Sequence, residues 1–395
     1  MAVALTAFAA LCIFVLTNPR PPVYDEGAHL ARASALASAT SIRGWLLEND
    51  TSAAGPLYPA LHYSLSLGKG VLPAPWFRLP NLAALILVVL LLGDQLKRRG
   101  VSNHWAIAFT LLATPTIWVL SGLALTEMPA LCGAAVACYG ASRLAAKEGV
   151  DWTWATVVAL GVVLATTGRQ TYAAALPGIV MLAAADRRSF LVAAGAVFVG
   201  MVPLFALIVV WGGLLPPKLT YMGGGFSLLH IVYALGYVGI TVLLLAPGFL
   251  LARWKIVLPV AATITVLNSW FGWVSFTTLS SVQRMAGHPG LMRSLEAAAS
   301  VVFIGAAAAF LLAMVLELLR SRERVFWGFA LSTIGLCLAC GAVTAQFSSR
   351  YTGMTAIFLV PLLVPWVRFS GWTVLRLVFG LSIGAAALYS YLRPV

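Results

Sequence analysis

The chain has 395 residues, of which 61% are hydrophobic and only 9% are charged, and its mean hydropathy is +0.95. A soluble core could not bury so much apolar surface, so this composition excludes a soluble globular protein and predicts several bilayer spans. The formal net charge of +13 does not require a nucleic-acid partner, because the basic residues lie in short turns where the membrane surface accounts for them.

About thirteen apolar runs follow one another along the chain, and each is expected to be helical because lipid offers no hydrogen-bond partner to an open backbone. The first run lacks a basic segment before it and a small-residue cleavage site after it, which favours a retained helix over a signal peptide. We therefore predict an all-α polytopic membrane protein with about 11–13 transmembrane helices. We expect one domain over residues 1–395, with a long first outer loop (18–80) and no separate soluble domain. The runs cover residues 2–17, 81–95, 104–121, 128–145, 152–168, 172–185, 190–211, 228–251, 256–279, 296–319, 325–346, 351–367 and 372–391.

Lys and Arg cluster in alternate turns between these runs. If the amino terminus is cytoplasmic, strict alternation places every dense basic turn on the cytoplasmic side. These turns contain Lys97–Arg99, Arg143 with Lys147, Arg187–Arg188, Arg253 with Lys255, Arg320–Arg324 and Arg368. The opposite face receives isolated carboxylates and single cations instead. The topology rule leaves those residues unexplained, which makes them the functional candidates.

The first outer loop begins with an unusual concentration of charge. Asp25 and Glu26 are adjacent directly after the first span, and His29 lies four residues beyond Asp25, on the same face of a helix. The Ala-rich segment 28–38 favours a helix, and segment 57–65 is amphipathic with aromatic residues suited to a membrane interface. Two short helices on the outer surface are therefore predicted.

Several short motifs together resemble the GT-C superfamily of membrane glycosyltransferases. They are Tyr24-Asp25-Glu26 with His29, Gly55–Pro59, Phe77–Asn81, Leu125–Pro129, Thr166–Thr171, and Ser349-Arg350-Tyr351 followed by Val360-Pro361. Within that superfamily the chain is most similar to protein O-mannosyltransferases, bacterial lipopolysaccharide-sugar transferases and dolichyl-phosphate-glucose glucosyltransferases. It departs from the family pattern at Glu127, where the acidic residue is more often Asp.

The resemblance implies transfer of a sugar from a polyprenyl-phosphate donor to a glycan, lipid or protein acceptor. An acceptor hydroxyl needs a base, for which Asp25 is the first candidate and Glu26 the second. The leaving phosphate needs cations, because it gains negative charge in the transition state. The candidates for this role are Arg350 with Tyr351, Arg169, Lys218, Arg284, His288 and Arg293. Glu127 and His29 form a second acidic or acceptor site. No cofactor is certain, although a divalent cation held by Asp25, His29 and Glu127 is chemically conceivable.

Other interpretations remain open at this point. Single arginines at helix ends, such as Arg169, can be interfacial anchors, and His29 can cap the loop rather than bind a ligand. A transporter or flippase for a lipid-linked or anionic solute is the main alternative function, but no internal repeat supports it. A noncatalytic scaffold would not need Asp25, Glu127 and Arg350 on one side. The expected location is a bacterial inner membrane with a periplasmic active site, although a protein of the endoplasmic reticulum would have the same topology.

Overall fold

The computed structural model describes residues 2–146, 151–223, 225–276 and 289–393, and every regular element within these ranges is helical. The predicted all-α architecture is therefore confirmed. The α-helices are α1 (Ala2–Thr17), α2 (Glu26–Ala37), α3 (Ile42–Leu47), α4 (Leu57–Leu65), α5 (Leu79–Arg98), α6 (His104–Phe109), α7 (Pro115–Gly122), α8 (Glu127–Ala145), α9 (Trp152–Gly168), α10 (Leu176–Leu182), α11 (Arg187–Trp211), α12 (Leu228–Leu245), α13 (Pro247–Leu251), α14 (Trp254–Phe271), α16 (Pro289–Arg320), α17 (Arg324–Ala339), α18 (Arg350–Gly353), α19 (Ala356–Leu363) and α20 (Gly371–Leu392).

Among the described residues, seven helices are long and apolar enough to cross a membrane, so the chain is an integral membrane protein. These spans lie in α5, α11, α12, α14, α16, α17 and α20. A further apolar pair is bent: α6 with its 3-10 extension (Thr110–Ala113) meets α7 at 80°, as in a broken span or a re-entrant loop. Thr114 between them is extended, as expected for a residue that precedes proline.

Several of the other predicted apolar runs form shorter helices of 10–17 residues, which are Leu5–Thr17, Trp152–Gly168, Gln170–Leu182 and Ala356–Trp366. The run at 152–168 is the 17-residue α9, and the run at 351–367 is divided between α18 and α19. α8 is instead buried along most of its length, so protein rather than lipid surrounds it.

α8 and α9 pack against each other through glycines. A Cβ on Gly161 would lie 2.4 Å from the Ala137 nitrogen, and a Cβ on Gly133 would lie 2.5 Å from the Ala165 nitrogen. Small residues at these positions let two membrane helices approach closely. This contact brings the start of α8 beside the end of α9, and so fixes where Glu127 and Arg169 meet.

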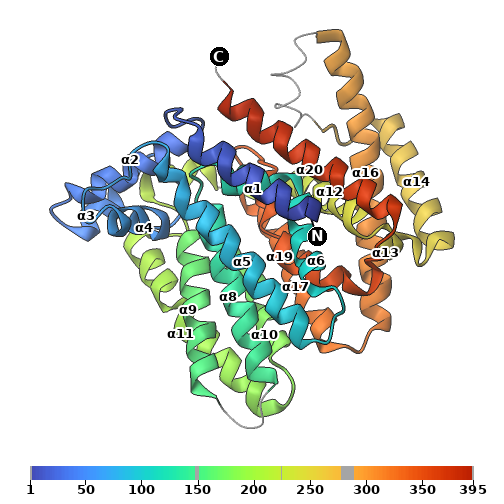
Figure 1. Cartoon of the computed structure of the whole chain (residues 1–395), viewed down its shortest axis with the longest axis horizontal. Helices are drawn as coiled ribbons and strands as arrows, with labels where there is room; N and C mark the ends of the chain where they lie inside the picture. Colours follow the sequence, from blue (N-terminus) through green and yellow to red (C-terminus); the bar gives the residue numbers. More distant parts are fainter. Residues whose placement is uncertain (1, 147–150, 224, 277–288, 394–395) are drawn as a thin grey trace.

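The first outer loop folds as a small structured unit. Its predicted helices are confirmed as α2 and α4, and α3 is an additional helix between them. Leu30, Tyr58 and Phe77 form a separate buried cluster with Ala124, which precedes α8. Figure 1 shows α2, α3 and α4 together at the upper left of the molecule. The loop is thereby packed onto the helical bundle.

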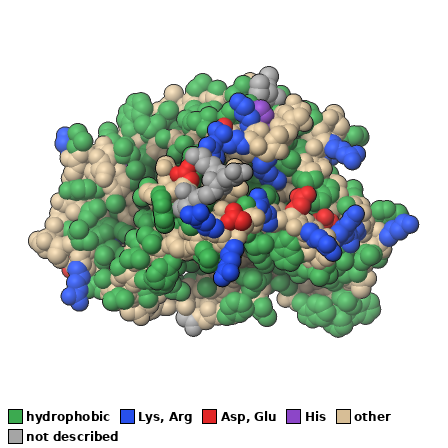
Figure 2. Space-filling view, turned by 90° about the horizontal axis from the view of Figure 1, so that it is seen from below, with side chains coloured by type: hydrophobic (Ala, Val, Ile, Leu, Met, Phe, Trp, Pro, Cys, Tyr) green, Lys and Arg blue, Asp and Glu red, His purple; other side chains and the backbone are tan. Residues whose placement is uncertain are grey.

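The molecule has two differently charged ends, separated by α8, whose 19 residues span about 28 Å. At the outer-loop end, α2–α4 lie near Glu127. At the basic end, Arg98, Arg99, Arg143 and Arg324 line a single cavity. Figure 2 shows Lys and Arg side chains gathered over the central part of the face seen from below Figure 1. Four arginines from the dense basic turns thus lie together, as the sequence predicts.

Candidate active site

Asp25 and Arg350 form an ion pair, although 325 positions separate them in the sequence. An Arg350 Nη2–H donates to Asp25 Oδ2 at 2.6 Å. Asp25 immediately precedes α2, and Arg350 is the first residue of α18. The Asp25 side chain is 41% exposed, whereas that of Arg350 is only 8% exposed. The carboxylate is therefore held by a buried cation while remaining accessible.

Glu127 joins the same group of charges. Arg169 Nη2 donates to Glu127 Oε1, and Arg350 Nη1 lies 3.9 Å from that oxygen. Glu127 is fully buried, so its charge requires the two cations beside it. We call Asp25, Glu127, Arg169 and Arg350 the ionic cluster; it gathers two carboxylates and two guanidinium groups from four distant segments.

Two aromatic rings flank the cluster. The Arg350 guanidinium carbon lies 5.0 Å from the ring centre of Tyr24, and that of Arg169 lies 5.7 Å from the ring centre of Tyr351. Such contacts orient guanidinium groups without neutralising their charge. Tyr351 is thus placed at the site, where its ring contacts Arg169 rather than its sequence neighbour Arg350.

The cluster also contains guanidinium groups with unused hydrogen-bonding capacity. Arg350 Nη1 and Arg169 Nε are buried without a hydrogen-bond partner in the described structure. Asp25 Oδ1 likewise receives no hydrogen bond from any described residue. Buried charged donors are normally satisfied. The two arginine donors can therefore bind an anion placed beside Asp25.

Glu26 has a different environment from its neighbour. It is fully buried and accepts hydrogen bonds from Arg78 Nε at 2.9 Å and Nη2 at 2.8 Å. Its oxygens also accept from the backbone N–H groups of Val23 at 2.8 Å and Ala124 at 2.7 Å. With both oxygens occupied, Glu26 ties the outer loop to the segments before α5 and α8. Of the two adjacent carboxylates, only Asp25 is exposed.

Arg78 and Asn81 are scaffold residues to which the sequence interpretation gave no role of their own, although it included them in a motif. The Asn81 side-chain nitrogen lies 2.9, 2.7 and 2.8 Å from the carbonyl oxygens of Leu120, Leu123 and Leu125, and so fixes the link between α7 and α8. A lone polar residue at the start of a long apolar run is the signal that identifies them. Both lie in the Phe77–Asn81 motif.

His29 lies beside the ionic cluster within a buried aromatic group. Its ring centre is 6.1 Å from that of Tyr58, which lies 4.6 Å from that of His62. The ring nitrogens of both histidines and the Tyr58 hydroxyl have no hydrogen-bond partner among the described residues. Burial lowers the pKa of each histidine to about 4, so both rings are neutral at pH 7.

We expect these histidines to make the protein acid-sensitive. Between pH 6.5 and 4 the unfolded chain binds protons that buried His29 and His62 exclude, so stability falls as pH decreases through this window. Each group accounts for up to about 3 kcal/mol at pH 4. Thermal unfolding in detergent at several pH values measures this effect. His62→Phe should flatten the pH dependence, whereas an unchanged slope in that variant would contradict the assignment.

The remaining predicted residues lie apart from the cluster or outside the described residues. Lys218 and Arg293 are exposed, and neither forms an ion pair with a cluster residue. Arg284 and His288 lie outside the described ranges. In the part of the chain that the structure describes, no three His, Cys, Asp or Glu side chains could hold one metal ion. Asp25, His29 and Glu127 therefore do not form a metal-binding group.

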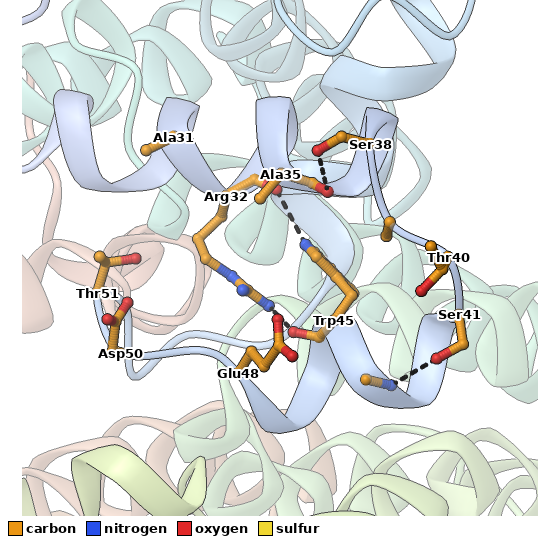
Figure 3. Close-up of a pocket in the computed structure, with 12 residues that line it drawn as sticks. Ala31, Arg32, Ala35, Ser38, Thr40, Ser41, Trp45, Glu48, Asp50 and Thr51 are labelled. Carbon is orange, nitrogen blue, oxygen red and sulfur yellow. Dashed lines mark hydrogen bonds between the residues drawn. The ribbon is translucent and has the colours of Figure 1, made fainter.

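A polar cavity of about 370 Å³ opens between α2 and α3. Arg32 lies at its centre, donating from Nη2 to the Trp45 carbonyl at 2.6 Å while its guanidinium carbon lies 4.4 Å from the Trp45 ring centre (Figure 3). Glu48, Asp50 and several hydroxyl groups complete the lining. Arg32 and Trp45 also line a much smaller cavity together with His29 and Thr126. Thr126 is the residue before Glu127, so this smaller cavity lies on the side of the ionic cluster. The sequence interpretation missed this cavity because its residues meet only when the loop folds.

No protein-family model, no curated protein and no solved structure matches this chain.

Proposed function

We propose that the protein is a glycosyltransferase that moves a sugar from a polyprenyl-phosphate donor to an acceptor hydroxyl at the outer-loop end. The observation that carries this proposal is the position of Arg350, which pairs with accessible Asp25 and lies beside buried Glu127. A base and cations for a phosphate leaving group are the parts that this reaction requires. The motifs that resemble the GT-C superfamily contribute the same residues.

In the proposed reaction the acceptor oxygen attacks the anomeric carbon of the sugar. Asp25 takes the acceptor proton as the new C–O bond forms. The bond between that carbon and the phosphate oxygen breaks, and its electron pair leaves with the phosphate. The unpaired N–H groups of Arg350 and Arg169 are suited to bind the phosphate as its charge increases. Attack from the side opposite the phosphate inverts the anomeric configuration.

The polar cavity between α2 and α3 supports a hydroxylated acceptor. Its carboxylates and hydroxyl groups offer hydrogen bonds to such a molecule. A sugar-containing glycan or lipid has complementary chemistry. We therefore assign the acceptor side of the reaction to the first outer loop.

The charge distribution supports a membrane orientation. The basic end contains arginines from several dense turns, so it faces the cytoplasm under the positive-inside rule. The ionic cluster then faces the periplasm of a bacterial inner membrane, or the lumen in an endoplasmic reticulum version. A donor whose polyprenyl tail lies in the bilayer presents its phosphate at that level.

Arg350 provides a direct test of the proposal. Arg350→Gln should lower sugar transfer by about 10²–10³-fold, because it removes the charged donor shared by Asp25 and Glu127. Purified protein in liposomes is supplied with labelled polyprenyl-phosphate sugars, and transfer to acceptor lipids or glycans is measured.

Arg322→Gln is the matched control, because this exposed arginine lies at the basic end. It should retain near-parent transfer. Parent protein that moves the labelled lipid across the bilayer without transferring its sugar would contradict the transferase and favour a flippase.

A further inference from the structure

A second charged cavity, of about 600 Å³, lies at the basic end. Its arginines come from three separated helix ends: Arg98 and Arg99 from α5, Arg143 from α8 and Arg324 from α17. The other lining residues are Gln95, Tyr139, Ser142, Leu182, Val325 and two alanines. This basic cavity is about one α8 length from the ionic cluster, so the proposed transfer reaction does not use it.

Only part of this positive charge is matched within the protein. Asp94 accepts hydrogen bonds from Arg98 Nε and from the Tyr139 hydroxyl, each at 2.6 Å. The Arg143 guanidinium carbon lies 4.5 Å from the Trp154 ring centre, a contact that leaves its charge in place. Within the described ranges, Arg99, Arg143 and Arg324 form no ion pair with a carboxylate. Among the described residues these three cations thus lack a directly paired carboxylate, although Glu323 lies close enough to act on Arg99, and Asp94 on Arg143, electrostatically.

The helix dipole explains why some of the four cavity arginines lie where they do. Arg98, Arg99 and Arg143 lie at the carboxyl ends of α5 and α8, where the helix dipole favours cations. Arg324 is the first residue of α17, where the dipole disfavours a cation. The topology rule explains basic turns on this face, but not their convergence around one cavity. An anion in the basic cavity would offset this repulsion.

The lining indicates the kind of anion. Arginine side chains present planar groups of N–H donors that match phosphate oxygens. Gln95 Nε2 donates to Ser142 Oγ at 2.7 Å, so one wall is a neutral polar pair rather than a competing carboxylate. Leu182, Val325 and the alanines add an apolar side. Basic pockets between membrane helices at the cytoplasmic surface suit the phosphate of an anionic lipid.

We propose that the basic cavity binds a phosphate group, supplied by an anionic phospholipid of the adjoining leaflet. Arg99, Arg143 and Arg324 bind the phosphate oxygens, while the apolar side contacts the start of the lipid chains. Binding neutralises the convergent arginines and stabilises the packing of α5, α8 and α17 at this end. The site is separate from the proposed donor site and does not depend on the proposed enzymatic activity.

Native mass spectrometry of the purified full-length protein tests this proposal. Phosphatidylglycerol and phosphatidylcholine are titrated separately into the detergent-solubilised protein, and inorganic phosphate forms a third titration. We expect phosphatidylglycerol to bind more tightly than phosphatidylcholine. Equal affinity for the two lipids would overturn the proposal. Binding of inorganic phosphate without binding of phosphatidylglycerol would overturn the lipid source.

Variants locate the binding. Combined Arg99→Gln, Arg143→Gln and Arg324→Gln should weaken phosphatidylglycerol binding by about fivefold per arginine, or about 100-fold in total. The charge-matched control combines Lys97→Gln, Arg188→Gln and Arg322→Gln, which lie on the same face outside the cavity lining.

The control variant should keep affinity within about threefold of the parent, since headgroup binding requires the cavity rather than general surface charge. Lysine in place of all three arginines keeps the charge but loses the planar donor groups, so it should weaken binding less than glutamine does, and this variant remains informative if the glutamine variant does not fold. Equal losses in the cavity and control variants would overturn the location.

Discussion

Asp25→Asn is expected to reduce sugar transfer by about 10²–10⁴-fold, the usual contribution of a general base. Asn has nearly the same shape as Asp, but its neutral amide cannot take the proton from the hydroxyl of the acceptor. Because the Asp25 side chain is 41% exposed, the substitution should leave the protein folded. Transfer is measured with purified protein, a labelled polyprenyl-phosphate sugar and an acceptor, beside a thermal-unfolding measurement.

Glu323→Gln is the control for this experiment. It removes a different exposed carboxylate, at the basic end of the molecule, and should have little effect on transfer. If Asp25→Asn retained parental turnover with saturating donor, Asp25 would not be the base. A loss of turnover together with a large loss of stability would instead indicate that Asp25 serves the fold.

Arg78→Met is expected to destabilise the protein by about 3–5 kcal/mol, because it leaves the fully buried carboxylate of Glu26 without its cation. The remaining hydrogen bonds from Val23 and Ala124 cannot neutralise that charge. Thermal or denaturant unfolding in detergent measures the loss. We also expect lower expression of the folded protein.

The matched control is Arg253→Met, which breaks the partly exposed pair with Glu317, whose closest atoms are 3.7 Å apart. Its cost should stay below about 1 kcal/mol, since solvent screens such a pair. Equal losses of unfolding free energy in the two variants would show that the buried Arg78–Glu26 pair contributes no more to stability than a partly exposed pair.

Hydrophobicity and charge placement made much of the fold predictable. Long apolar runs must form helices in lipid, and the loop segments around Ala28–Ser38 and Leu57–Leu65 have clear local helix signals. Helix α3 and the division of residues 104–121 at Pro115 were not predicted. Mean hydropathy over a long window does not reveal a short helix or a break within an apolar run.

The candidate site was predictable in part. Asp25, Glu127, Arg169 and Arg350 could be singled out because topology does not explain isolated charges on the outer face. The different environments of Asp25 and Glu26 could not be predicted, since adjacent carboxylates look alike until Arg78 is seen to pair with one of them. The loop cavity around Arg32 and Trp45 was missed because its lining residues meet only when the loop folds.

The sequence by itself determined that this is an all-α membrane protein with its dense basic turns apart from its isolated acidic residues. That follows because the free energy of transferring an apolar segment or a charge from water to lipid depends on the local composition of the chain. Only the tertiary structure decided which charges meet. Arg350 reaches Asp25 across 325 positions, and the basic cavity forms from three helix ends, because the close packing of helices, rather than sequence distance, sets these contacts.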